Sequence, residues 1–178
     1  MRWSDLKRKL LDSDQKELLR LLKALYELNQ TNKAFFEAAL GASRETAIAS
    51  YKRDIAEAID PQGSAPIELR KGRKAISDYK KAVPGDLLGH VDLMLHYVEA
   101  GTNHTLTYGD IDEGFYDSLC SMIDQILKVS SSLPSEEHRR CAERLAALDD
   151  RTRGQIGWGY SDHVADAAEE IASQAESR

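Results

Sequence analysis

The chain has 178 residues, of which 42% are hydrophobic and 30% charged, and its formal net charge is −6. These values are typical of a soluble globular protein, and disorder is excluded because apolar residues recur along most of the chain. Two cysteines without a C-x-x-C pair exclude a disulfide scaffold and a cysteine-rich zinc module. No run approaches the roughly 18 apolar residues of a membrane span, and Met1 is followed directly by charged residues. We therefore expect neither a membrane protein nor a signal peptide.

The charges are unevenly distributed along the chain. Residues 1–83 carry 17 basic and 12 acidic side chains, a net charge of +5, whereas residues 84–178 carry 7 and 18, a net charge of −11. The two halves could attract each other within one fold or between two copies. The acidic total disfavours nucleic acid as a partner of the whole protein, because binding phosphates needs a basic face.

Hydrophobic periodicity predicts helices from the N-terminus onwards. The first part of the chain contains four, over residues 4–11, 13–28, 31–40 and 43–59. In the second of these, Leu18, Leu22 and Leu25 recur at helical spacing, with Leu21 and Leu28 beside them, and form a wide apolar stripe. Two prolines and a glycine predict a loop over residues 60–66, which is a candidate point of subdivision.

The second part of the chain is also predicted to be helical. The expected helices cover residues 70–83, 86–100, 112–130, a segment starting at 134 and a last one over 162–175. Residues 101–110 are predicted to be a connector, whose stretch 105–108 favours β-structure but is too short for a sheet. The fold class is therefore all-α, with about eight helices in a single domain over residues 1–178. Both a compact bundle and a short stack of antiparallel helix pairs fit the short connections.

Three motifs resemble those of a known family. Residues 92–101 and 107–118 read DLMLHYVEAG and TYGDIDEGFYDS, and residues 157–162 read GWGYSD. They are similar to the motifs L-M-L-x-Y-V-E-x-G, Y-G-D-I-x-E-x-F-Y-x-S and G-W-G-x-x-D of an uncharacterised bacterial family, catalogued as a domain of unknown function. The leucine-rich start of the chain is similar too, so the resemblance covers most of the sequence. It implies a small, helical, cytoplasmic bacterial protein and implies no activity.

Asp92, His96 and Glu99 are candidate ligands for a divalent metal ion. They lie at i, i+4 and i+7, which places them on one face of a helix. Carboxylate and imidazole groups at this spacing suit such an ion, although a further ligand would have to come from another element. The alternative, which we favour, is that they form the polar edge of an amphipathic helix.

A second cluster of polar side chains surrounds the predicted connector, and we expect any functional centre to lie here. Its members are Glu99, Tyr108, Asp110, Glu113, Tyr116 and Asp117. The predicted connector would bring Glu99, at a helix C-terminus, close to Glu113, at the next N-terminus. A carboxylate at a C-terminus needs a partner, for which Tyr108, Tyr116, His104 or a metal ion are candidates.

The acidic start of the helix predicted over 112–130 has a simpler explanation than calcium binding. Asp110 and Asp112 match the start of an EF-hand loop only in part, because glycine falls at the fifth position and Ser121 at the twelfth. We therefore reject an EF-hand. Asp110 or Asp112 is expected to cap the helix, with Glu113 in its favourable first turn.

The remaining candidates are expected to be structural. Zinc or cysteine chemistry would require His138, Cys141, Cys120 and His163 to meet in space, which their spacing does not predict. The basic stretch over residues 70–81 is expected to be a solvated helix face or a partner of the acidic half. Glycines 154, 157 and 159 do not form a dinucleotide loop, and Ser161 or Asp162 is expected to cap the last helix.

Three functions remain as hypotheses. The first is an interaction or adaptor protein without enzymatic activity, which binds a protein partner or associates with itself. The second is a metal-dependent, hydrolase-like enzyme that uses Asp92, His96 and Glu99. The third is a weak nucleic-acid binder through residues 70–81. The chain has no nucleophile elbow and no phosphate-binding loop, so we favour the first hypothesis and expect no cofactor.

Overall fold

The computed structural model describes residues 1–41, 43–63 and 65–176, with side chains described as far as residue 174. Within these ranges it contains nine helices and no strand, which confirms the all-α prediction. The helices are α1 (Trp3–Asp12), α2 (Gln15–Leu28), α3 (Gln30–Leu40), α4 (Arg44–Ile59), α5 (Leu69–Ala82), α6 (Leu87–Tyr108), α7 (Glu113–Ser130), α8 (Ser135–Thr152) and α9 (Tyr160–Glu176).

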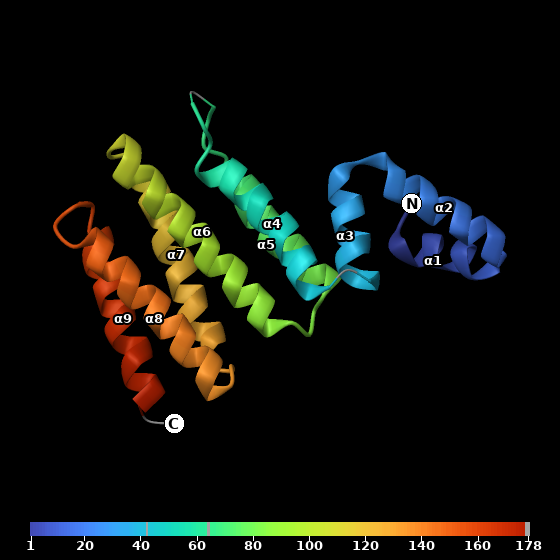
Figure 1. Ribbon diagram of the computed structural model, residues 1–178. Coiled ribbons are helices and arrows are strands. Elements are labelled where there is room, and N and C mark those ends of the chain that lie inside the picture. Colours follow the sequence, from blue (N-terminus) through green and yellow to red (C-terminus); the bar gives the residue numbers. More distant parts are fainter. Residues whose placement is uncertain (42, 64, 177–178) are drawn as a thin grey trace.

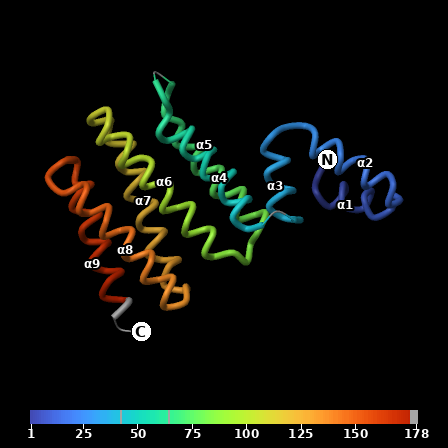
Figure 2. The backbone as a smooth tube through the Cα atoms, viewed as in Figure 1, coloured from blue at the N-terminus to red at the C-terminus, as the bar shows by residue number. Residues whose placement is uncertain are grey.

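Helices α4 to α9 form a short stack of antiparallel pairs. Each helix packs against its successor in the pairs α4–α5, α6–α7 and α8–α9, and neighbouring pairs pack through α4–α6, α6–α8 and α7–α9 (Figure 1). The second of the two predicted architectures, a stack of helix pairs, is therefore the one observed. Helices α1 and α2 stand outside the stack, and α3 joins them to it; residues 1–41, which contain these three helices, are called the arm below (Figure 2).

A single hydrophobic core runs from α3 to α9. It begins at Ala34, passes through α6, and reaches Ile171 at the far end. The loop over residues 60–66 does not separate two units, because the helices on either side of it pack together. After this loop, the backbone N–H of Glu68 donates a hydrogen bond to the carbonyl of Ala58 at 2.8 Å.

The connector predicted over residues 101–110 is wrong, because α6 continues as a helix to Tyr108. Gly101, whose lack of a side chain suggested a helix end, lets Leu119 of α7 approach closely: a Cβ at Gly101 would lie 2.5 Å from Leu119 Cδ2. Thr105 begins the stretch that the sequence marks as β-favouring, but it is buried and its Oγ1 lies 2.6 Å from the hydroxyl of Tyr116 of α7, so packing overrides that preference. The helix ends at Gly109, whose φ of 93° suits glycine.

Helix α7 begins as predicted, and α9 does not. Asp112 Oδ1 accepts a hydrogen bond from the backbone N–H of Phe115 at 2.8 Å, which confirms Asp112 as the N-cap of α7. Helix α9 begins at Tyr160, so Ser161 lies within it. Ser161 Oγ instead lies 2.7 Å from the carbonyl oxygens of both Thr152 and Ile156, and ties α9 to the end of α8.

The described helices include none that is both long and apolar enough to cross a membrane.

Candidate functional site

The predicted metal ligands of α6 lie in an ion-pair network that joins three helices. Arg144 of α8 donates from Nη1 to Asp92 Oδ1 at 2.6 Å, and from Nε and Nη2 to the two carboxylate oxygens of Glu99, each at 2.7 Å. Lys52 Nζ of α4 lies 2.9 Å from Asp92 Oδ2. Two cationic side chains therefore occupy the carboxylate oxygens that a metal ion would need.

His96, the third predicted ligand, points its ring into the same network. Its Nε2 donates to the backbone carbonyl of Lys52 at 3.1 Å, and its Nδ1 lies 4.0 Å from Glu99 Oε2. Burial, reinforced by Lys52, lowers the pKa of His96, so the ring is neutral at pH 7. No group of three or more His, Cys, Asp or Glu side chains in the described part of the chain is arranged to hold a metal ion.

The charges of this network stabilise each other. Burial acts to raise the pKa of Asp92, but the hydrogen bonds from Lys52 and Arg144 outweigh it, and the pKa is lowered. The bidentate contact between Arg144 and Glu99 is the strongest geometry available to such a pair. The network therefore clasps α4, α6 and α8 together. Its arrangement supports a structural role, which the sequence predicted only as the polar edge of a helix.

The second predicted cluster is split by the structure. Glu99 was expected near Glu113, but it lies nine residues before the end of α6, on the order of 13 Å along the helix axis. Its partner is Arg144, and none of the predicted candidates. Glu113 and Asp117 are exposed on α7.

The remaining members of that cluster meet where α6 ends. Tyr116 donates from its hydroxyl to Asp110 Oδ1 at 2.9 Å, and Thr105 Oγ1 lies 2.6 Å from the same hydroxyl. The ring of Tyr108 packs against His104, with 4.7 Å between ring centroids. The contacts of Tyr116 hold the short connection between α6 and α7 in place, whereas Tyr108 packs within its own helix, so Tyr116 and Asp110 form a clasp between two helix ends.

Trp158 completes this end of the molecule. Its ring stacks on Tyr116 with 6.3 Å between centroids, and 58% of the residue is exposed. Its φ of 59° lies in the left-handed region, with Gly159 next to it at 69°. The glycines of this loop therefore allow the turn that places Trp158 over Tyr116.

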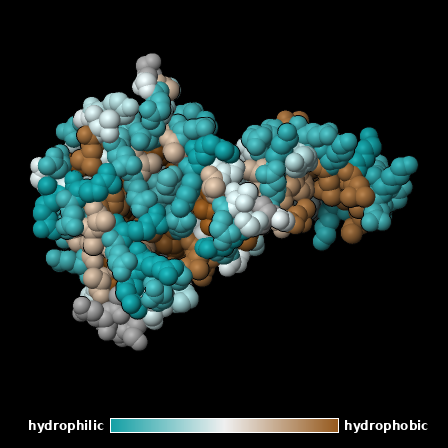
Figure 3. All heavy atoms as spheres, viewed as in Figure 1, coloured by the Kyte–Doolittle hydropathy of each residue, from teal (hydrophilic) through white to brown (hydrophobic). Residues whose placement is uncertain are grey.

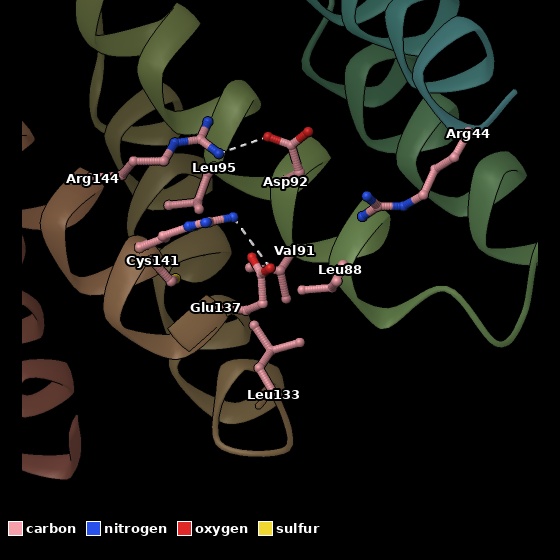
Figure 4. Close-up of a pocket in the computed structure, with 10 residues that line it drawn as sticks. Arg44, Leu88, Val91, Asp92, Leu95, Leu133, Glu137, Cys141 and Arg144 are labelled. Atoms are coloured by element: carbon pink, nitrogen blue, oxygen red, sulfur yellow. Dashed lines mark hydrogen bonds and ion pairs between the residues drawn. The ribbon is translucent and has the colours of Figure 1, made fainter. Parts of the chain in front are cut away.

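A groove of about 240 Å³ runs between α6 and α8 (Figure 4). Its floor is apolar, and arginines from α4 and α8 reach its rim: Arg44, Arg140 and Arg144. Each of them contacts a carboxylate of the protein itself. Burial raises the pKa of Cys141, which also lines the groove, to about 11, so its thiol is protonated at neutral pH and is a poor nucleophile.

Of the six basic side chains over residues 70–81, five are exposed, and only that of Arg73 is used within the protein. Arg73 turns inward, where it donates to Ser118 Oγ at 3.0 Å and lies over the ring of Tyr97. Lys74 and Lys81 both contact Asp78 on the surface of α5. These contacts agree with the prediction of a solvated helix face.

The arm presents a large apolar surface that the sequence did not reveal as a surface. Every residue of α2 is exposed except Leu18, which is half-buried. Leu19, Leu22 and Tyr26 of α2 and Phe36 and Leu40 of α3 line a groove of about 610 Å³. Figure 3 shows apolar residues gathered over this part of the molecule. In the sequence, the sign of this surface is the width of the leucine stripe of α2. The stripe is wider than the face that a single neighbouring helix can cover.

Comparison of the chain with models of protein families, with curated proteins and with solved structures finds no match. The resemblance to the uncharacterised bacterial family therefore stays a prediction.

Proposed function

We propose that the chain is a non-enzymatic interaction protein that binds another polypeptide through its N-terminal arm. The observation that carries this proposal is α2, a helix of 14 residues in which five of the six leucines, at positions 19, 21, 22, 25 and 28, are exposed. A helix of this length is marginally stable in water unless its apolar face packs against something. Contiguous exposed apolar surface on a soluble protein marks a binding site.

The arm has the chemistry of a protein-binding face. Aromatic side chains lie beside the leucines, with Tyr26 and Phe36 in edge contact at 6.2 Å between ring centroids. Charged side chains of both signs, Lys23 and Glu37, stand at the rim of the groove. An apolar centre with a polar rim is the usual composition of a protein–protein interface.

The enzymatic alternative finds little support in the polar clusters. Asp92 and Glu99 are held by Arg144, and burial raises the pKa of both Cys120 and Cys141 to about 11. The nucleophiles and metal ligands that the sequence offered are therefore engaged in structure or are protonated. The nucleic-acid alternative is weakened by the internal contacts of Arg73.

Site-specific photocrosslinking tests the proposed function. A photoreactive amino acid would replace Leu22 in the arm, or Leu87 at the start of α6 as a matched control, since 44% and 41% of these two leucines are exposed. In a lysate of the organism that encodes the protein, we expect defined adducts from position 22 and none from position 87. Equal labelling from both positions, or no adduct from either, would contradict the proposal.

A further inference from the structure

We propose that the partner of the arm is a second copy of this chain, so that the protein is a twofold-symmetric dimer held by its arms. This inference rests on the proposed function and names the partner. In such a dimer the same patch of both copies forms the interface, and each residue that contacts the partner is contacted in return.

The arm has the two complementary shapes that a twofold interface requires. Leu18, Leu21, Leu25 and Leu28 recur at spacings of three, four and three, which builds a ridge along α2. The groove between α2 and α3 lies on the neighbouring side of the same helix and is lined by Leu19 and Leu22. In a symmetric pair, the ridge of each copy lies against the groove of the other, and the four helices form a small bundle.

The uncovered apolar area matches what a stable dimer needs. A leucine side chain offers roughly 100 Å² of apolar surface and an aromatic one roughly 200 Å². Scaled by their exposed fractions, Trp3, Tyr26 and the seven exposed leucines of residues 1–41 leave on the order of 600 Å² uncovered. A standard interface buries about 800 Å² on each partner, and about 65% of a homodimer interface is apolar. Taken over all its faces, the arm therefore exposes about as much apolar area as one such interface buries, and on the order of 400 Å² of it belongs to α2 and Leu40.

The charges of the arm favour a copy of itself over a lipid surface. Residues 1–41 carry eight basic and six acidic side chains, a net charge of +2, so two arms do not repel each other strongly. On the flank of α2, Lys16, Arg20 and Lys23 precede Glu27. A helix that lies on a membrane carries a more uniformly basic polar face.

Light scattering coupled to size-exclusion chromatography tests this inference on the full chain. We expect a mass of twice the 19.9 kDa of one chain at micromolar concentrations and above. Leu22→Glu should raise the dissociation constant at least about tenfold, because it places a charge at the centre of the apolar face. Leu87→Glu, the same change at an equally exposed leucine outside the arm, should leave the dimer unchanged. Both variants should keep the helical circular dichroism of the wild type, because neither leucine is buried.

Three results would overturn the inference. The first is a monomer of 19.9 kDa over the whole concentration range. The second is a dimer that Leu22→Glu and Leu87→Glu weaken equally. The third is a monomer that binds vesicles of anionic phospholipid through Leu22, which would assign the face to lipid.

The same measurements separate this inference from the proposed function. If the purified chain is monomeric while position 22 still forms adducts with a different polypeptide, the dimer is excluded and the interaction role stands. If the chain is monomeric and position 22 forms no adduct, both proposals fail. If the position 22 adduct has twice the chain mass and the dimer is disrupted by Leu22→Glu, both are supported.

Discussion

At the scale of single residues, Arg144 makes the ion pairs that join α8 to α6. It contacts Asp92 and Glu99 at once, and all three side chains are between a quarter and a third exposed. Removing Arg144 would leave Glu99 partly buried without a counter-charge, whereas Asp92 would keep Lys52. A cluster that the sequence offered as a metal site is thus an anchor between helices.

Arg144→Met is therefore expected to lower the free energy of unfolding at pH 7 by about 2 kcal/mol, less than for a fully buried pair because solvent screens the charges. Urea denaturation measures this loss. The matched control is Arg139→Met on the same helix, whose ion pair with Glu136 is exposed on both sides and should be worth less than about 0.5 kcal/mol. Equal losses for the two variants would show that Arg144 is an ordinary surface residue.

His96 makes the stability of the fold depend on pH, and the lowered pKa of its ring gives the direction of this dependence. Burial lowers the pKa of the folded His96, so below the unfolded pKa of about 6.5 the unfolded chain binds a proton that the folded chain resists. The stability is therefore complete above that pH and falls as the pH decreases towards 5. His96→Gln, which can still donate to the carbonyl of Lys52, should make the decline shallower. Unfolding curves across this window measure the slope, and parallel declines in both proteins would refute the assignment.

At the scale of elements, the sequence predicted most helices because core packing requires their periodicity. Helix α7 is an example, since Phe115, Leu119, Met122 and Ile126 recur at helical spacing and are all buried. The end of α6 was missed because glycine and threonines mark a helix end only where no neighbour packs against them. The candidate site was missed for a related reason, since a stripe of leucines has the same pattern whether it faces a core or an open groove.

Gly72 shows how closely α5 approaches its neighbours. A Cβ at this position would lie 2.7 Å from Ile59 Cδ1 and 2.9 Å from Tyr97 Cε2, and both side chains are fully buried. Gly72→Ala should therefore destabilise the protein by about 1 to 2 kcal/mol, although alanine favours a helix by about 1 kcal/mol. Thermal unfolding measures the change.

Gly114 provides the control for this substitution. It lies in the first turn of α7 and is exposed, and a Cβ there would come no closer than 3.4 Å to Asp112 Oδ1. Gly114→Ala should leave the stability unchanged or raise it by up to about 1 kcal/mol. A destabilised Gly114→Ala, or a Gly72→Ala of wild-type stability, would contradict the packing described for α5.

At the scale of the whole molecule, the chain consists of a well-packed stack and an arm with opposite properties. The stack buries its apolar side chains in one core, and it carries most of the negative charge. The arm buries little and leaves its leucines open. A protein built in this way keeps its fold without the arm face being covered, while the arm itself gains stability only when something packs on it.

Amide hydrogen exchange of α2 at low and high protein concentration tests the central claim most directly. We expect the amides of α2 to exchange quickly when the protein is dilute and to become protected as the concentration rises, because the partner copy covers the leucines. The amides of α6, whose residues are buried in the core, should exchange at the same slow rate throughout. Exchange of α2 that does not change with concentration would contradict the account.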